Sequence, residues 1–187
     1  MARARPIPGL AADTEFTAAA VRIVAVRAAE VAEHSHDVLD VSDIERLHDL
    51  RVATRRLRAA LEVFEACFPK KDHRAALREV KALADALGDR RDRDVTIALF
   101  QKLATAMPAP DRAGVASLVG ELRAEQAAAN EDLAPFVADE RLAELDERLS
   151  ELLGTAGGQP AEAPTRGGDG GSPPGPSGGG RPEGNGA

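Results

Sequence analysis

Residues 11–153 are built almost entirely from helix-favouring residues, and this feature limits the fold more than any other. Alanine and leucine dominate the segment, which contains only three glycines, Gly88, Gly114 and Gly120. Such a composition favours helix. Apolar residues recur with helical spacing, whereas no strand alternation and no repeat of about 20–50 residues is found. The sequence therefore predicts an all-α fold, a helical bundle of long antiparallel helices.

Capping residues, prolines and one glycine set the expected helix boundaries. Asp13 or Thr14 is expected to cap the first helix, and Pro69 stops the second. Gly88 is expected to end the third helix in the left-handed conformation that glycine favours, and the chain restarts directly after it. The expected helices span residues 13–37, 43–68, 72–88, 89–107, 111–130 and 139–153.

The two ends of the chain are expected to lie outside the helical domain. Residues 154–187 contain 13 Gly and 6 Pro in 34 positions and have no apolar period. A segment of this kind cannot bury enough apolar surface to offset the entropy of ordering, so we expect a disordered tail. Residues 1–12 are expected to form a flexible N-terminus, which leaves residues 13–153 as the folded domain.

Composition excludes several classes of protein. Aromatic residues make up 3% of the chain, with no Trp and no Tyr, which argues against modules that stack the bases of single-stranded nucleic acid. One cysteine, Cys67, allows neither an internal disulfide nor a cysteine-rich zinc site. No apolar run approaches the ~18 residues of a membrane helix, and no signal peptide is recognisable. We expect a cytoplasmic protein with no membrane partner.

The formal net charge of −7 conceals a cationic middle segment. Residues 1–45 have a charge balance of −4 and residues 94–187 a balance of −8, but residues 46–93 carry 13 basic and 8 acidic side chains, a balance of +5. This asymmetry indicates a local anion-binding surface, and the acidic flanks disfavour a long nucleic-acid duplex. A solvated helical face with paired charges is the competing interpretation.

Basic residues in this segment follow one face of each of two expected helices. On the second helix they fall within an arc of about 80°, opposite the apolar face. They are His48, Arg51, Arg55 and Arg58. On the third helix Arg74, Arg78 and Lys81 share a face. Two such helices side by side would form a trough for an extended polyanion, and arginine suits phosphate because its planar group donates paired hydrogen bonds. Asp49, Glu62 and Asp85 could neutralise part of this surface.

Other chemistry has less support. On a helix, His34 and His36 point about 160° from each other, so they cannot share one metal ion. Asp92 and Asp94 could hold Mg²⁺, but a helix cap or pairing with arginine side chains is the favoured interpretation. No Gly-rich phosphate loop, catalytic carboxylate pair or activated Cys67 is recognisable. We therefore expect no metal, no cofactor and no enzymatic activity.

Two segments resemble the signature of the CHAD domain, the conserved histidine α-helical domain. The first is His48-x-x-Arg51-Val52-Ala53-x-Arg55-Arg56-Leu57-Arg58, followed by Phe64. The second is Leu87-Gly88-x-x-Arg91-Asp92-x-Asp94-Val95. The resemblance covers roughly residues 14–107, with weaker helical similarity to about residue 153.

The resemblance implies an all-helical bundle that binds inorganic polyphosphate through a basic surface. Family members are associated with polyphosphate granules, and some are fused to CYTH domains that hydrolyse triphosphates. By this likeness, the phosphate-facing residues would be His48, Arg51, Arg55, Arg56, Arg58 and Arg91. Helical periodicity adds Arg74, Arg78 and Lys81.

One departure from the family pattern bears on the oligomeric state. The family domain typically contains two helical halves, each with its own basic helix, and this chain shows one. Residues 111–153 hold no histidine and have 11 acidic against 4 basic residues. We therefore expect one CHAD-like half, either as a half-domain with a shallow trough or as a homodimer that completes a basic channel.

The expected function is non-catalytic binding of inorganic polyphosphate by the basic face of residues 46–93. Two alternatives stay open. One is an accessory subunit that presents polyphosphate or triphosphate to a phosphohydrolase. The other is an adaptor whose basic trough docks an acidic protein segment.

Overall fold

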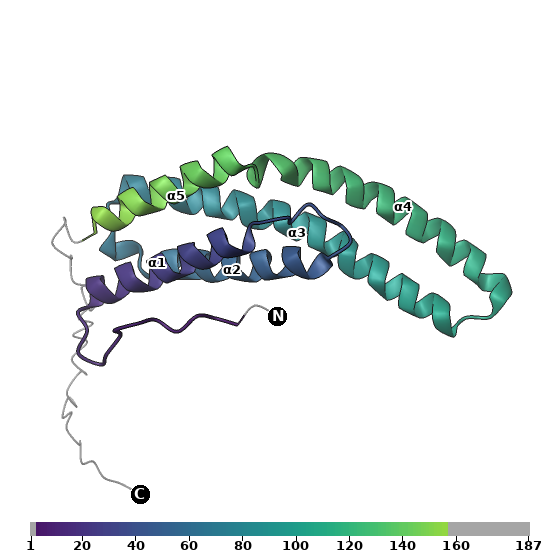
Figure 1. Cartoon of the computed structure of the whole chain (residues 1–187), viewed down its shortest axis with the longest axis horizontal. Coiled ribbons are helices and arrows are strands. Elements are labelled where there is room, and N and C mark those ends of the chain that lie inside the picture. Colours follow the sequence, from purple (N-terminus) through teal and green to yellow (C-terminus); the bar gives the residue numbers. More distant parts are fainter. Residues whose placement is uncertain (1–2, 157–187) are drawn as a thin grey trace, which may run out of the picture.

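A computed structural model describes residues 3–156 as helices joined by short connections (Figure 1). The long helices are α1 (Phe16–His34), α2 (Ile44–Val63), α3 (Lys70–Ala106), α4 (Ala109–Leu133) and α5 (Asp139–Gly154). Two 3₁₀ turns, η1 (Glu65–Cys67) and η2 (Ala134–Phe136), connect α2 to α3 and α4 to α5. Residues 3–156 contain no strand, so the predicted all-α fold is confirmed. Residues 157–187, where most of the expected tail falls, lie outside the described part.

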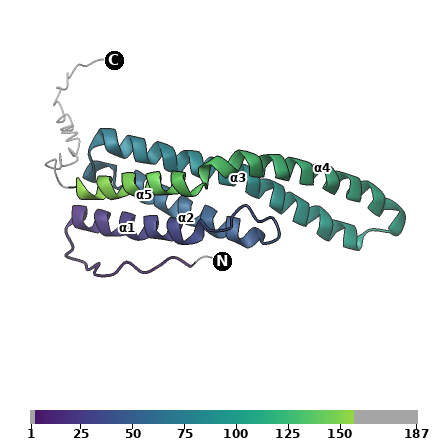
Figure 2. The same ribbon diagram turned by 45° about the horizontal axis from the view of Figure 1, so that its top comes forward.

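Four helices form a bundle at one end of the molecule (Figures 1 and 2). α1 packs on α2, α2 packs on the first half of α3, and α5 returns to contact both α3 and α1. The core is mainly aliphatic, and its fully buried members include Val24, Leu47, Leu57, Leu61 and Leu87. Because burial of each such side chain contributes about 1.5–3 kcal/mol, this apolar core supplies most of the free energy that holds the helices of the bundle together.

The second half of α3 and most of α4 form a two-helix hairpin that projects beyond the bundle (Figure 1). We call residues 95–123 the arm. Ile97 and Val119 are its only buried hydrophobic residues, whereas Val95, Leu99 and Leu103 are exposed. The arm therefore has little core of its own. Within residues 3–156, no helix combines the length and the apolar character that a membrane span requires.

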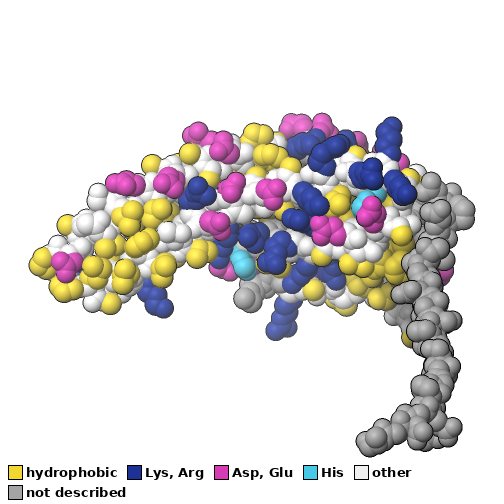
Figure 3. All heavy atoms as spheres, turned by 180° about the vertical axis from the view of Figure 1, so that it is seen from behind, with side chains coloured by type: hydrophobic (Ala, Val, Ile, Leu, Met, Phe, Trp, Pro, Cys, Tyr) yellow, Lys and Arg dark blue, Asp and Glu magenta, His cyan; other side chains and the backbone are white. Residues whose placement is uncertain are grey.

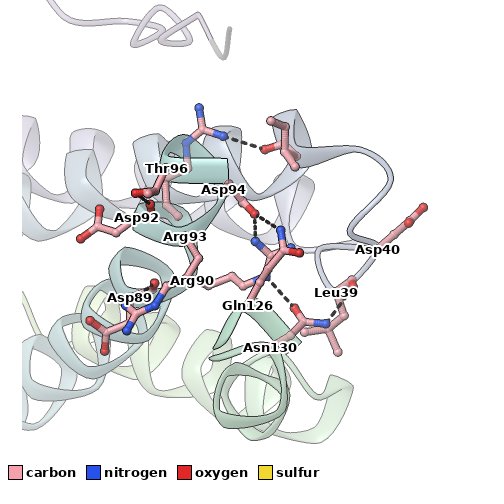
Figure 4. A network of polar contacts seen from close by, with 12 residues as sticks. Leu39, Asp40, Asp89, Arg90, Asp92, Arg93, Asp94, Thr96, Gln126 and Asn130 are labelled. Atoms are coloured by element: carbon pink, nitrogen blue, oxygen red, sulfur yellow. Dashed lines mark hydrogen bonds and ion pairs between the residues drawn. The ribbon is translucent and has the colours of Figure 1, made fainter. Parts of the chain in front are cut away.

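A buried ion pair fixes the junction between the bundle and the arm (Figure 4). Arg90 and Asp94 lie one turn apart on α3, are only 1% and 2% exposed, and pair with each other. Gln126 Nε2 donates to Asp94 Oδ1 at 2.6 Å, and Arg90 Nε donates to Asn130 Oδ1 at 3.2 Å. Asn130 Nδ2 donates in turn to the backbone oxygen of Leu39 at 2.9 Å. The network thus ties α3 to α4 and to the α1–α2 connection.

The expected helix end at Gly88 is wrong. α3 continues without a break through 37 residues, and Gly9 is the only glycine with a positive φ in residues 3–156. The reason is tertiary packing, since Leu83, Leu87 and Arg90 bury one continuous face of α3 on both sides of Gly88. This burial outweighs the cost of about 1 kcal/mol for a glycine inside a helix.

The helix starts were predicted with mixed success. α2 begins next to residue 43, where the second helix was expected to start, and Asp43 caps it by accepting a hydrogen bond from the Glu45 amide at 3.2 Å. The first helix begins later than expected, because Glu15 acts as its cap in place of Asp13 or Thr14. It also ends earlier, at His34. These differences of a few residues leave the helix faces unchanged.

The segment that precedes α1 contacts that helix. The Arg5 amide donates to Glu30 Oε1 at 2.6 Å, Arg27 Nη2 donates to the Arg5 oxygen at 3.1 Å, and Arg22 bonds to the Gly9 oxygen. Residues 3–12 therefore run along one side of α1, a position that the sequence did not indicate. Their expected flexibility stays a prediction.

Candidate anion-binding surface

Two contacts define how α2 and α3 lie against each other. Near the end of α2, Glu62 Oε1 lies 3.2 Å from Lys81 Nζ. At the start of α2, the backbone oxygen of Ile44 accepts a hydrogen bond from Arg91 Nη1 at 3.3 Å. The two helices are therefore antiparallel, as expected. We call the line between these two contacts the α2–α3 seam.

The predicted basic residues of α2 lie along this seam. Arg51 follows Ile44 by seven residues and Arg58 precedes Glu62 by four, so each shares a face with one of the two contact residues. Arg55 is exposed and His48 is half-buried on the solvent side of the same face. The structure thus brings these four residues together with Lys81 and Arg91 of α3.

Most of these basic residues have no anionic partner. Within residues 3–156, five of the predicted residues make no hydrogen bond and no ion pair: His48, Arg51, Arg55, Arg74 and Arg78. The Nε atom of Arg51 is buried and is itself without a hydrogen-bond partner in this part of the chain. A solvated face of paired charges would look different, because its cations would be matched by nearby carboxylates.

Arg58 and Lys81 are the exceptions, because both pair with Glu62. Its Oε1 atom accepts a hydrogen bond from Arg58 Nε at 3.1 Å and lies 3.2 Å from Lys81 Nζ. The Arg58 hydrogen bond and then the Lys81 hydrogen bond hold the pKa of the Glu62 carboxyl below its ordinary value. All three side chains are about 40% exposed, and such exposed pairs contribute at most about 1 kcal/mol. A phosphate chain could therefore replace Glu62 as the partner of both cations.

Arg56 stands apart from the seam. It follows Arg51 by five residues, which turns its side chain about 140° around α2. Its positive charge acts on Glu30 of α1, a residue that is 1% exposed. Burial alone would raise the pKa of Glu30, but the Arg5 amide, the Arg27 guanidinium and the charge of Arg56 together hold that pKa below its ordinary value. The phosphate contact of Arg56 rests on the resemblance alone and stays a prediction.

Arg74 and Arg78 extend the basic surface along α3. Both are exposed, and they precede Lys81 by seven and three residues. Figure 3 shows Lys and Arg side chains gathered over the bundle, whereas the arm at the left carries mainly hydrophobic and acidic side chains. On this face the basic side chains are therefore concentrated over the bundle.

The remaining candidate residues have structural positions. Asp92 and Asp94 lie inside α3, so neither caps a helix, and Asp94 pairs with Arg90. His73 is buried, and its Nε2–H donates to the Leu61 oxygen at 2.9 Å. Burial raises the pKa of the Cys67 thiol. Among residues 3–156, no three His, Cys, Asp or Glu side chains are grouped as metal ligands.

Sequence reasoning expected a helix cap or an arginine partner for Asp94, but it identified neither Arg90 as that partner nor the burial of the pair, although the four-residue spacing was visible. Arg90 falls between Asp89 and Arg91 in a run of charged residues, and such runs usually face solvent. The missing information was which face of α3 is covered by α4. Only the position of Gln126 and Asn130 shows that this face is buried.

Comparison with known proteins agrees with this geometry. A family model described as the CHAD domain matches residues 22–173, which extends well beyond the 14–107 region of clearest resemblance. A comparison with curated proteins finds no match. The family match covers more than half of the chain, both basic motifs, the part of α1 from Arg22 onward and the whole of the other bundle helices. The chain therefore belongs to the CHAD domain family, which is known from polyphosphate-associated proteins.

Proposed function

We propose that this protein binds inorganic polyphosphate along the α2–α3 seam and does not hydrolyse it. The observation that carries the proposal is a row of cations without carboxylate partners. Arg51 and Arg55 have no ion pair within residues 3–156, and they lie between Arg58 at one end of the row and Arg91 at the other. Like charges on neighbouring turns repel by a few tenths of a kcal/mol, which a bound polyanion would reverse.

Polyphosphate fits this surface because it repeats one anionic group along a narrow chain. Residues three or four apart on a helix rise about 4.5–6 Å, so successive arginines can each meet a different phosphate. Arginine donates paired hydrogen bonds to phosphate oxygens and keeps its charge at any physiological pH. Release of counterions from the polyanion should make the affinity fall steeply with salt, as it does for nucleic acids.

The direct test reverses three charges on the seam. A variant with Arg51, Arg55 and Arg58 changed to Glu is titrated with long-chain polyphosphate at about 50 and 200 mM salt. By analogy with single-stranded nucleic acids, loss of three contacts should lower the slope of log affinity against log salt by about 2. Equal binding by variant and wild type would overturn the assignment of the site.

The matched control places the same charge change on the arm. Its three substitutions to Glu are at Lys102, Arg112 and Arg123, all of them exposed. If binding depended only on net charge, both variants would lose the same affinity. We expect the arm variant to bind nearly as the wild type does, apart from a small long-range effect that salt removes.

Two further measurements separate the proposal from its alternatives. Long-chain polyphosphate incubated with the protein should release no orthophosphate; release would indicate catalysis. A polyglutamate peptide of matched charge should compete poorly, because its carboxylates are carried on flexible side chains that must lose rotamer freedom before they can match the row of arginines. Displacement of polyphosphate by equimolar polyglutamate would favour an adaptor for acidic protein segments.

A further inference from the structure

Gly88 has no explanation in the folding of α3. It lies near the middle of a 37-residue helix and does not use the positive φ that glycine alone tolerates well. A glycine at such a position weakens a helix by about 1 kcal/mol relative to alanine. A Cβ atom built on Gly88 would meet no heavy atom within 4 Å, so no neighbouring element requires the glycine.

Gly88 lies on the face of α3 that carries the seam contacts to α2. Gly88 follows Lys81 by seven residues, which places the two about 20° apart on the same face of α3. Three residues further on is Arg91, which bonds to Ile44. Gly88 therefore lies on the seam between the two contacts that join α3 to α2.

The facing turn of α2 carries Arg51. Since Ile44 lies against Arg91 and Glu62 lies against Lys81, the antiparallel register sets the middle of α2 opposite the stretch that contains Gly88. Arg51 is half-buried there, and its Nε atom has no hydrogen-bond partner within residues 3–156. Gly88 is also half-buried, although nothing in the protein occupies the space where its side chain would be.

We propose that Gly88 is the point of close approach, where the bound polyphosphate chain crosses the backbone of α3 between Arg51 and Lys81. The absence of a side chain there lets phosphate oxygens reach the guanidinium of Arg51 while staying beside the cations of α3. The inference rests on the proposed function and deepens it, because it identifies the part of the α3 backbone that the bound chain contacts. It also assigns a positioning role to a residue that carries no charge.

This role predicts opposite changes in stability and in binding. Gly88→Ala should raise the urea midpoint of unfolding, because alanine favours the helix and its Cβ meets nothing. The same variant should bind long-chain polyphosphate several-fold more weakly, and Gly88→Leu should lose at least tenfold. A purely structural role of Gly88 would make stability and binding fall together.

Matched controls come from α4. Gly114 and Gly120 also lie inside a helix with no heavy atom within 4 Å of a built Cβ, but both are outside the seam. Gly114→Ala and Gly120→Ala should raise the urea midpoint and leave the affinity for polyphosphate unchanged. Equal loss of affinity in these variants would overturn the inference.

The outcomes also separate this inference from the proposed function. If the wild type binds polyphosphate, the charge-reversed seam variant does not, and Gly88→Leu binds as the wild type does, the close approach at Gly88 is refuted and the proposed function stands. If the wild type does not bind polyphosphate, the proposed function fails, and the inference fails with it.

Discussion

Asp94→Asn should destabilise this protein more than almost any other single substitution that preserves side-chain size. The change removes one charge and almost no volume, and it leaves the Arg90 guanidinium, whose side chain is 1% exposed, without its carboxylate. Breaking a buried ion pair in this way costs about 3–5 kcal/mol. A typical domain has about 5–15 kcal/mol of stability, so the loss is a large fraction of the total.

Urea unfolding followed by circular dichroism measures this loss. With a slope of about 1–3 kcal/mol per molar urea, the midpoint should fall by at least about 1 M. Asp92→Asn is the matched control, since Asp92 is exposed two residues away on the same helix and should shift the free energy of unfolding by less than about 0.5 kcal/mol. Equal effects of the two substitutions would refute the reasoning, because Arg90 would then be hydrated or otherwise paired.

A double variant isolates the cost of the unpaired charge. Replacing Arg90 by Met and Asp94 by Leu removes both charges and keeps the space filled. Buried ion pairs replaced by apolar residues are often neutral or stabilising, so this variant should recover much of the loss of Asp94→Asn. Recovery should be incomplete, because Gln126 and Asn130 each lose a polar partner in α3.

Three further predictions follow from the remaining ionisable groups. Glu62→Gln should raise polyphosphate affinity several-fold at low salt and less at high salt, because it releases Arg58 and Lys81; unchanged affinity in a binding titration would contradict this. Because the pKa of Glu30 is lowered from 4.5 in the folded state, its contribution to stability is present above that pH and is lost as the pH falls; Glu30→Gln should flatten the acid limb of a plot of urea midpoint against pH. The Cys67 thiol, whose pKa burial raises, should react slowly with a disulfide reagent at pH 8 and rapidly in urea; equal rates would show that it is accessible.

The sequence by itself determined the helical class and the composition of the basic surface. Spacing of three and four residues is enough to place Arg51, Arg55 and Arg58 on one face of α2, because helix geometry is local. The cap at Asp43 was equally readable, since a side chain that accepts from the next turn needs no tertiary partner. The same local logic failed at Gly88, where packing on both sides of the glycine overrides its preference for a helix end.

Tertiary structure alone decided which charges are free. Arg56 and Arg51 belong to the same motif, yet one faces Glu30 of α1 and the other lines the seam. Arg90 and Arg91 are neighbours, yet one is buried against Asp94 and the other reaches the start of α2. Adjacent residues have similar local sequence but point to different helices, and the cost of burying a charge depends on the partner found there.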